Sequence, residues 1–138
     1  MNQEKCVIVL DGSLPTGVAA NTAAILGITM GQRRPDVVGG DVCDGGGRTH
    51  SGVIRFPVPV LRGTPEILGE IRAKLSEPAF SGLTAVDFTD LAQGCRTYEE
   101  FIEKMAVTPP EALRYLGLAL CGEGKLVSRL TGSLPLLR

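Results

Sequence analysis

The chain has 138 residues, of which 43% are hydrophobic and 21% are charged, and its formal net charge is -1. This length and composition fit a single globular domain over residues 1–138 and argue against a disordered or fibrous chain. The near-zero net charge argues against nucleic acid as a partner, because binding to a phosphate backbone normally requires a basic excess.

The cysteines and the first residues bear on the compartment. Cys6 and Cys121 lie in apolar runs and are expected to be buried thiols. The four cysteines form no CxxC pair, so the sequence predicts neither a metal site nor a cofactor. The first residues, MNQEK, lack the pattern of a signal peptide. Together these features predict a cytoplasmic protein.

The first predicted elements are a strand at residues 6–10, CVIVL, and a helix at residues 17–32 with Thr16 as its cap. The helix is apolar nearly all round, so we expect it to be sandwiched between the sheet and another layer, or against a second subunit. Residues 12–32 carry no charge, but polar residues and glycines interrupt them, so no membrane span is predicted.

The turn between these elements is the first candidate site. In α/β proteins, ligands usually lie at the carboxyl ends of parallel strands, beside the free N–H groups of a helix. Asp11 follows the strand and Asn21 lies one turn into the helix, so both are ligand-binding candidates. Alternatively, Asp11 accepts hydrogen bonds from N–H groups of the turn and Asn21 bonds to a neighbouring loop.

Residues 33–52 predict a long surface loop, with a short strand near residues 37–42. In DGGGRTHSG, the glycines allow close backbone approach, and Arg48 and His50 add a cation and the chain's one imidazole. A glycine-rich hairpin turn explains the same letters. A metal site at Asp41, Asp44 and His50 is weakly supported, because a single histidine lacks partners at metal-binding spacing.

The middle of the chain predicts an edge strand, a helix and a further strand. In VIRFPVPVL, residues 53–61, Pro57 and Pro59 remove N–H donors from the same side of the strand, so we expect that side to face solvent. The helix spans residues 64–76, with Thr64 and Pro65 as cap and first position. The next strand is LTAVDF, residues 83–88.

The last third of the chain predicts further helices and a strand. Thr97 and Glu100 form a capping box for a helix, and Thr108 caps a shorter one that ends near Tyr115. LGLAL, residues 116–120, is an apolar strand. Lys125 follows in CGEGKLVSRLTG, which superficially resembles a phosphate loop but lacks the required spacing, so an ordinary helix start is favoured.

Strands that alternate with helices predict a layered α/β domain with a mainly parallel sheet. The two most uniformly apolar strands, residues 6–10 and 116–120, belong in its centre, which leaves the other two at its edges.

Several stretches in order resemble a known family. They are LPTGVAANTAAILG, GGDVCDGGGRTHSGV, FPVPVL, VDFTDLAQ, TYEEF and the ending GKLVSRLTGSLPLLR. Over residues 6–138 the chain resembles the bacterial family called domain of unknown function 2000, which is similar in fold to the class II peptidyl-tRNA hydrolases. The resemblance implies a three-layer α/β/α domain around a four-stranded mixed sheet of order 2-1-4-3.

The resemblance also bears on activity. Those hydrolases use a lysine in the opening turn, whereas the matching stretch here, PTGVAAN, has none, and Asn21 takes the place of a glutamine. They also use an aspartate after the third strand, which matches Asp87 or Asp90. The resemblance therefore implies the fold of a catalytic loop without peptidyl-tRNA hydrolase activity.

Three hypotheses follow for function. The first is a small-ligand-binding domain with its site near Asp11, Asn21, Arg48 and His50. The second is a hydrolase of a small amide or ester, with His50 as base and Asp87 or Asp90 assisting. The third is an interaction protein that forms a homodimer through the helix at residues 17–32 and the proline-marked edge.

Overall fold

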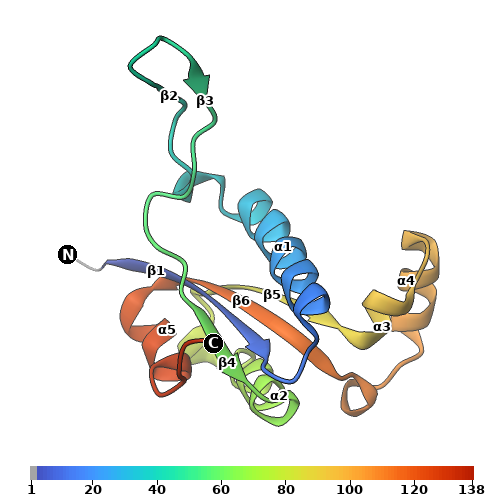
Figure 1. The fold of residues 1–138 in the computed structure, drawn as a ribbon. Helices are drawn as coiled ribbons and strands as arrows, with labels where there is room; N and C mark the ends of the chain where they lie inside the picture. The colour runs from blue at the N-terminus through green and yellow to red at the C-terminus, as the bar shows by residue number, and fades with distance from the viewer. Residues whose placement is uncertain (1–2) are drawn as a thin grey trace.

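The computed structural model describes residues 3–138 and contains a four-stranded mixed sheet, a separate two-stranded hairpin and five α-helices (Figure 1). The strands are β1 (Glu4–Asp11), β2 (Val42–Cys43), β3 (Thr49–His50), β4 (Val60–Gly63), β5 (Thr84–Thr89) and β6 (Tyr115–Glu123). The helices are α1 (Thr16–Arg33), α2 (Pro65–Lys74), α3 (Asp90–Gly94), α4 (Tyr98–Ala106) and α5 (Gly124–Thr131), with 3-10 turns at Pro35–Val37, Pro78–Phe80 and Pro110–Ala112.

The strand order of the main sheet is β4-β1-β6-β5, which differs from the predicted 2-1-4-3 in its numbers because the prediction did not count β2 and β3. The prediction counted four strands, whereas residues 42–43 and 49–50 form two more and pair only with each other. β1 and β6, the apolar strands, lie in the centre, and β4 and β5 lie at the edges.

The sheet is mixed, and the prediction from the element pattern that it is mainly parallel was wrong. β1 pairs in parallel with β4, but β6 runs antiparallel to both β1 and β5. The helices between β5 and β6 lie beyond the end of the sheet and do not cross back over it (Figure 1). The chain therefore re-enters the sheet from the end at which it left.

Helices cover both faces of the sheet, and the alternation of side chains along β1 divides the core between them. Cys6, Ile8 and Leu10 pack with Leu26 and Met30 of α1. The residues between them, Val7 and Val9, pack on the other face with Leu68 of α2 and Val127 of α5. The domain is thus layered as helix, sheet and helices.

The first helix is less covered than its composition predicts. Thr22, Leu26 and Met30 are buried, but Ile28 on the opposite side is 75% exposed. α1 packs on the sheet with one face only, so no second layer within residues 3–138 covers it, and the other expected cover, a second subunit, stays a prediction. The helix also begins one residue early, at Thr16, with Pro15 in place of the predicted cap.

Residues 38–54 form an arm that projects from the body and carries β2 and β3 at its tip (Figure 1). The prediction of one short strand near residues 37–42 does not describe this pair of strands, but the alternative interpretation, a glycine-rich hairpin turn in DGGGRTHSG, is confirmed. The strands have only two residues each, and all four side chains are exposed. Elements this short give no periodic pattern in a sequence.

The predicted edge strand is confirmed as an edge, but β4 begins only at Val60, after the second proline. The Pro59 carbonyl accepts a hydrogen bond from the Ile8 N–H, so the proline side faces β1 and not solvent as expected. The outer side of β4 pairs with the C-terminal tail: the Arg62 N–H donates to the Pro135 carbonyl, and the Leu137 N–H to the Val60 carbonyl.

Two predicted caps are formed and one predicted helix is not. The Thr64 hydroxyl accepts a hydrogen bond from the Ile67 N–H at the start of α2. The Thr97 hydroxyl accepts from the Glu100 N–H at the start of α4, although the Glu100 carboxylate bonds to the Arg96 N–H and not back to the cap. Residues 110–112 form a single 3-10 turn in place of the short helix, because β6 already begins at residue 115.

Candidate functional site

The opening turn is held together by Asp11, the last residue of β1. This side chain is 2% exposed, and its Oδ1 accepts hydrogen bonds from the Ser13 N–H at 2.9 Å and the Ser13 hydroxyl at 2.8 Å. Within residues 3–138, Oδ2 accepts no hydrogen bond, but it lies 3.6 Å from a guanidinium nitrogen of Arg114. Asp11 therefore accepts hydrogen bonds from the turn, as the alternative interpretation predicted.

Arg114 also connects this turn to Asp90. The Asp90 N–H donates to the Arg114 carbonyl at 2.9 Å, and the Arg114 N–H donates to Asp90 Oδ1 at 3.1 Å. The structure thus brings Asp11 and Asp90 to the same end of the sheet through a residue that the sequence analysis missed. A prediction that β6 is antiparallel would have placed Arg114 near Asp11, because that direction puts the start of β6 beside the end of β1.

A second arginine reaches the turn from β4. Arg62 donates a hydrogen bond to the Gly12 carbonyl at 3.0 Å, and a Cβ at Gly12 would overlap the Arg62 side chain. An open cavity of about 470 Å³ lies beside this contact, next to the start of α2. Asn21 is exposed on the surface of α1.

The arm holds Arg48 and His50 away from the aspartates of the body (Figure 1). His50 Nε2 lies 2.9 Å from Asp44 Oδ2, and both side chains are about half exposed. The bond to His50, with backbone N–H groups of the turn, lowers the pKa of Asp44. Because the arm separates His50 from β5 and α3, the structure does not assemble the predicted base with Asp87 or Asp90.

Lys125 lies at the other end of the sheet from Asp11. The N–H of Gly124, the first residue of α5, donates to the Gln3 carbonyl next to the start of β1. Lys125 itself is exposed. The predicted site residues therefore occupy the opening turn, the arm, the start of α5 and β5, and do not form one site.

Asp87 on β5 lies between two cavities. Its Oδ2 is 3.2 Å from Arg72 Nε of α2. On that side a cavity of about 730 Å³ is lined by α2 and by Tyr115, whose pKa is raised by burial and by the Asp87 charge. On the other side Asp87 borders the pocket described next.

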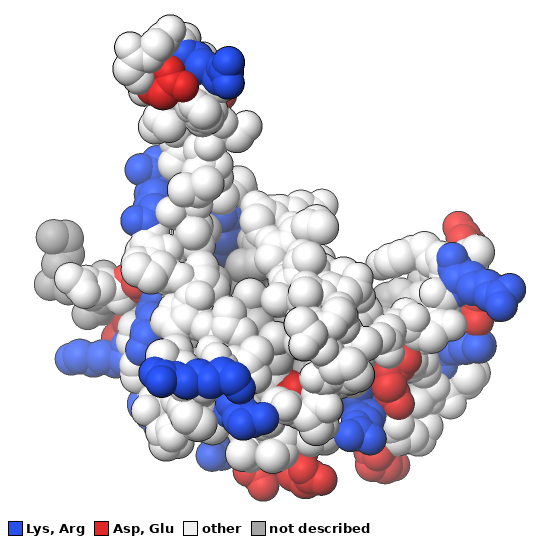
Figure 2. Space-filling view, in the orientation of Figure 1, with Lys and Arg blue, Asp and Glu red and all other residues white. Residues whose placement is uncertain are grey.

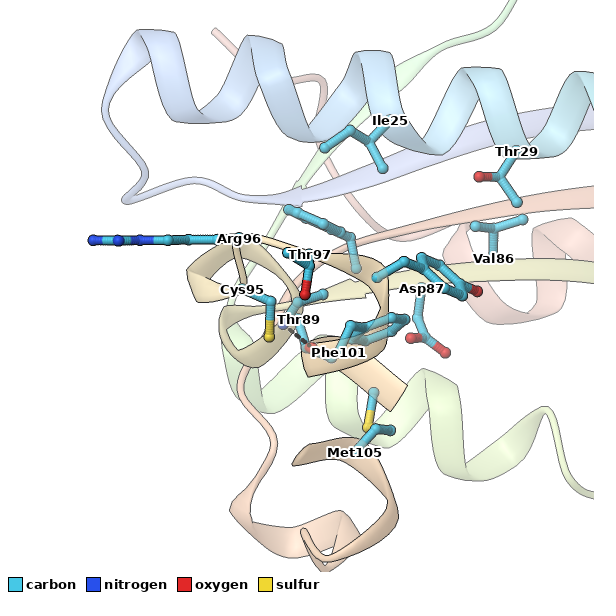
Figure 3. Close-up of a pocket in the computed structure, with 13 residues that line it drawn as sticks. Ile25, Thr29, Val86, Asp87, Thr89, Cys95, Arg96, Thr97, Phe101 and Met105 are labelled. Carbon is cyan, nitrogen blue, oxygen red and sulfur yellow. Dashed lines mark hydrogen bonds between the residues drawn. The ribbon is translucent and has the colours of Figure 1, made fainter. Parts of the chain in front are cut away.

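The second cavity is a pocket of about 440 Å³ between α1, β5, α3 and α4, which we call the α1–α4 pocket (Figure 3). Ile25 and Thr29 point into it from α1, and Phe101 and Met105 come from α4 on the opposite side. Arg96 points away from it. Its lining is Ile25, Thr29, Val86, Asp87, Phe88, Thr89, Ala92, Cys95, Arg96, Thr97, Tyr98, Phe101 and Met105.

Most polar side chains of the α1–α4 pocket already have partners within the chain. The Thr89 hydroxyl accepts from the Ala92 N–H, the Thr97 hydroxyl accepts from the Glu100 N–H, and the Cys95 thiol donates to the Leu91 carbonyl. The pocket therefore presents mainly apolar surface to a ligand. Sequence reasoning predicted a helix capped by Thr97 but gave no reason to expect a cavity beside it.

Within residues 3–138, no group of three or more histidine, cysteine, aspartate or glutamate residues is placed to hold a metal ion. No helix in the same range has the length and apolarity needed to cross a membrane.

Comparison with known proteins finds a family and a fold. Residues 4–138 match the model of a family described as protein of unknown function (DUF2000). A solved structure of a protein of unknown function from Agrobacterium tumefaciens superposes with a TM-score of 0.85 at 18% identity, covering 99% of this chain and 98% of that one. No curated protein matches the chain.

Proposed function

The chain belongs to the DUF2000 family, and we propose that it binds a small, neutral, largely apolar molecule in the α1–α4 pocket. The observation that carries this proposal is the state of α4. Its apolar residues fall on one side of the helix, yet all nine residues of α4 remain at least partly exposed. An amphipathic helix normally buries its apolar side against the core, so this side is available to a ligand.

The size of the pocket favours a small molecule. Its volume of about 440 Å³ lies within the range of about 300 to 1,000 Å³ that is typical of ligand pockets. Its walls come from two elements that are far apart in the sequence, α1 and α4, with β5 between them (Figure 3). A site between separate elements can enclose a ligand from several sides.

The charges around the pocket favour a neutral ligand. The Asp87 carboxylate is paired with Arg72, and the Arg96 side chain points away from the cavity. The side chains of Thr89, Cys95 and Thr97 are engaged in local hydrogen bonds, which leaves Thr29 as the best placed polar partner. We therefore expect a mostly apolar ligand that makes one hydrogen bond to the Thr29 hydroxyl.

A titration with the neutral fluorescent dye Nile red tests this proposal. We expect saturable binding, and we expect Phe101→Glu to weaken it at least about tenfold, because a carboxylate in the pocket must lose its hydration. Val107→Glu is the matched control, since Val107 directly follows α4, is 82% exposed and does not line the pocket. Equal losses in the two variants, or no saturable binding to the unaltered chain, would refute the proposal.

We do not extend the proposal to hydrolysis. The predicted base, His50, lies on the arm, and the opening turn from Asp11 to Asn21 contains no lysine. We propose, however, that the fold is like that of the class II peptidyl-tRNA hydrolases, and the four-stranded mixed sheet with helices on both faces supports this.

We also propose a cytoplasmic location. The four cysteines are free, and Cys6 and Cys121 are buried side by side in paired strands. Burial raises the pKa of the Cys6 thiol to about 12, which keeps it protonated and unreactive. Free thiols are typical of proteins in reducing compartments.

A further inference from the structure

The arm at residues 38–54 is organised by its own hydrogen bonds. At its base, the Gly39 N–H donates to the Val53 carbonyl, and the Arg55 N–H donates to the Val37 carbonyl. Further out, Asp41 Oδ1 accepts from the Gly52 N–H. The two limbs are so close that a Cβ at Gly52 would overlap the backbone of Gly39.

The tip of the arm is fixed by Asp44. Its Oδ1 accepts from the N–H groups of Gly46 and Arg48, its Oδ2 contacts His50, and its N–H donates to the Arg48 carbonyl. Gly47 has a φ of 85°, which only glycine adopts without strain. The arm is therefore pre-shaped by polar contacts, which lowers the entropic cost of docking it against a surface.

The apolar side chains of this arm are only partly covered by the part of the chain that the structure describes, and two valines are mostly exposed. Val42 is 59% exposed, Val53 is 75% exposed and Val38 is 38% exposed. A hairpin with two-residue strands is marginal in water unless it packs against something. The polar residues thus shape the arm, while its valines remain available for a contact.

The outer face of α1 is a second uncovered surface, which is uncharged and built mainly of small residues, with the polar side chain of Asn21 on the same side as Ile28. Ile28 is 75% exposed, and Ala20, Ala24, Gly27 and Gly31 lie on the same side of the helix. A Cβ added at Gly27 or Gly31 would meet open space. Because residues 12–32 carry no charge, the surface over α1 is white between the arm and the α3–α4 region (Figure 2).

We propose that two copies of the chain associate by laying each arm across the outer face of the partner's α1. Within one chain the arm points away from the body, so its tip cannot reach the chain's own α1 (Figure 1). The arm and the α1 face lie on the same chain, so one two-fold axis can satisfy both at once in a closed dimer. The small residues of α1 allow the backbone of a hairpin to approach, and the uncharged face repels neither Asp44 nor Arg48.

Sedimentation velocity over a range of protein concentrations tests this dimer. We expect a monomer–dimer equilibrium whose dissociation constant rises at least about tenfold in Ile28→Asp, and equally in the double variant Val42→Asp, Val53→Asp, because each buries an unpaired charge. Val107→Asp is the matched control, since Val107 is 82% exposed at the end of α4. Far-ultraviolet circular dichroism confirms that each variant is folded.

Mixing the variants gives the decisive result. A homodimer of either variant has both arm contacts damaged, whereas a mixed dimer of Ile28→Asp with the arm variant keeps one intact contact. We therefore expect the mixture to dimerise more tightly than either variant alone. A monomer at every concentration, or a dimer that the arm variant leaves unchanged, would overturn the proposal. Nile red binding to the α1–α4 pocket is a separate readout, since Ile28, Val42 and Val53 do not line that pocket.

Discussion

The two faces of the sheet are covered to different extents. On one face, α2 and α5 together enclose Val7, Val9 and Leu118, none more than 1% exposed. On the other face, α1 packs over β1, β6 and β5, and the α1–α4 pocket opens between α1, β5 and α4. The difference teaches that the face with two covering helices is closed over its central strands, while the face with one helix keeps surface free for binding.

The largest effect expected from this comparison concerns the closed face. Leu118→Ala should lower the free energy of unfolding by about 3 kcal/mol, because it leaves a cavity in a fully buried site. Phe101→Ala removes a larger side chain from the open pocket and should cost only about 1 kcal/mol, since little packing is lost there. Urea denaturation measures both, and a larger loss for Phe101→Ala would contradict the comparison.

A second test adds volume under α1. A Cβ at Gly117 of β6 would lie within about 3 Å of Leu10, Thr22 and Leu26. Gly117→Ala should therefore destabilise the protein by about 1 to 3 kcal/mol through overpacking. Gly69→Ala in α2, where a Cβ meets open space, should instead stabilise it by up to about 1 kcal/mol. Thermal unfolding that shifts in the same direction for both would show that the site under α1 is not tightly packed.

The thiols of the α1 face predict a dependence on alkaline pH. The pKa of Cys6 is raised by burial from about 9 to about 12, so the folded state keeps a proton that the unfolded state releases. The stabilisation is complete below about pH 9 and is lost as the pH rises towards 12. Cys6 alone contributes a slope of at most about 1.4 kcal/mol per pH unit. Urea denaturation at several pH values should give a smaller slope for Cys6→Ala, and an unchanged slope would assign the loss to other groups.

The smallest effects separate the caps of α2 and α4. Both Thr64 and Thr97 accept a hydrogen bond from the N–H three residues later. Thr64→Ala should lower global stability by about 1 kcal/mol, because α2 belongs to the closed face. Thr97→Ala should lower it by less than about 0.5 kcal/mol, because α4 can fray locally, but should weaken Nile red binding. Hydrogen exchange distinguishes the two, and equal global losses would place α4 in the cooperative core.

The sequence pattern predicts the elements of the core well. The central position of the apolar strands β1 and β6, the cap of α2 at Thr64 and the edge position of the proline-marked strand were all correctly predicted. These features depend on local propensity and on apolar periodicity, which a single chain displays directly. The direction of β6 was predicted incorrectly, because helices that lie beyond the end of the sheet give the same local sequence pattern as helices that cross back over it.

The candidate sites were predicted less well, for a physical reason. Arg114 lies close to Asp11 because β6 runs antiparallel to β1. The pocket lies between α1 and α4, which are far apart in the sequence. Both depend on long-range placement. The hairpin turn of the arm was predicted only as an alternative to a ligand-binding loop, because Asp44, Gly47 and Gly52 act through individual contacts, and such contacts have no period.

The pairing of the C-terminal tail with β4 has a consequence for solubility. Residues 135–137 bond to the outward N–H of Arg62 and the outward carbonyl of Val60, which are the groups that an unprotected edge offers to another sheet. The tail therefore covers this edge and protects the protein against edge-to-edge aggregation. Removing residues 133–138 should therefore expose this edge, along with the core contacts of Leu134 and Leu137, and allow the protein to form fibrils on storage, which turbidity and thioflavin T fluorescence would detect.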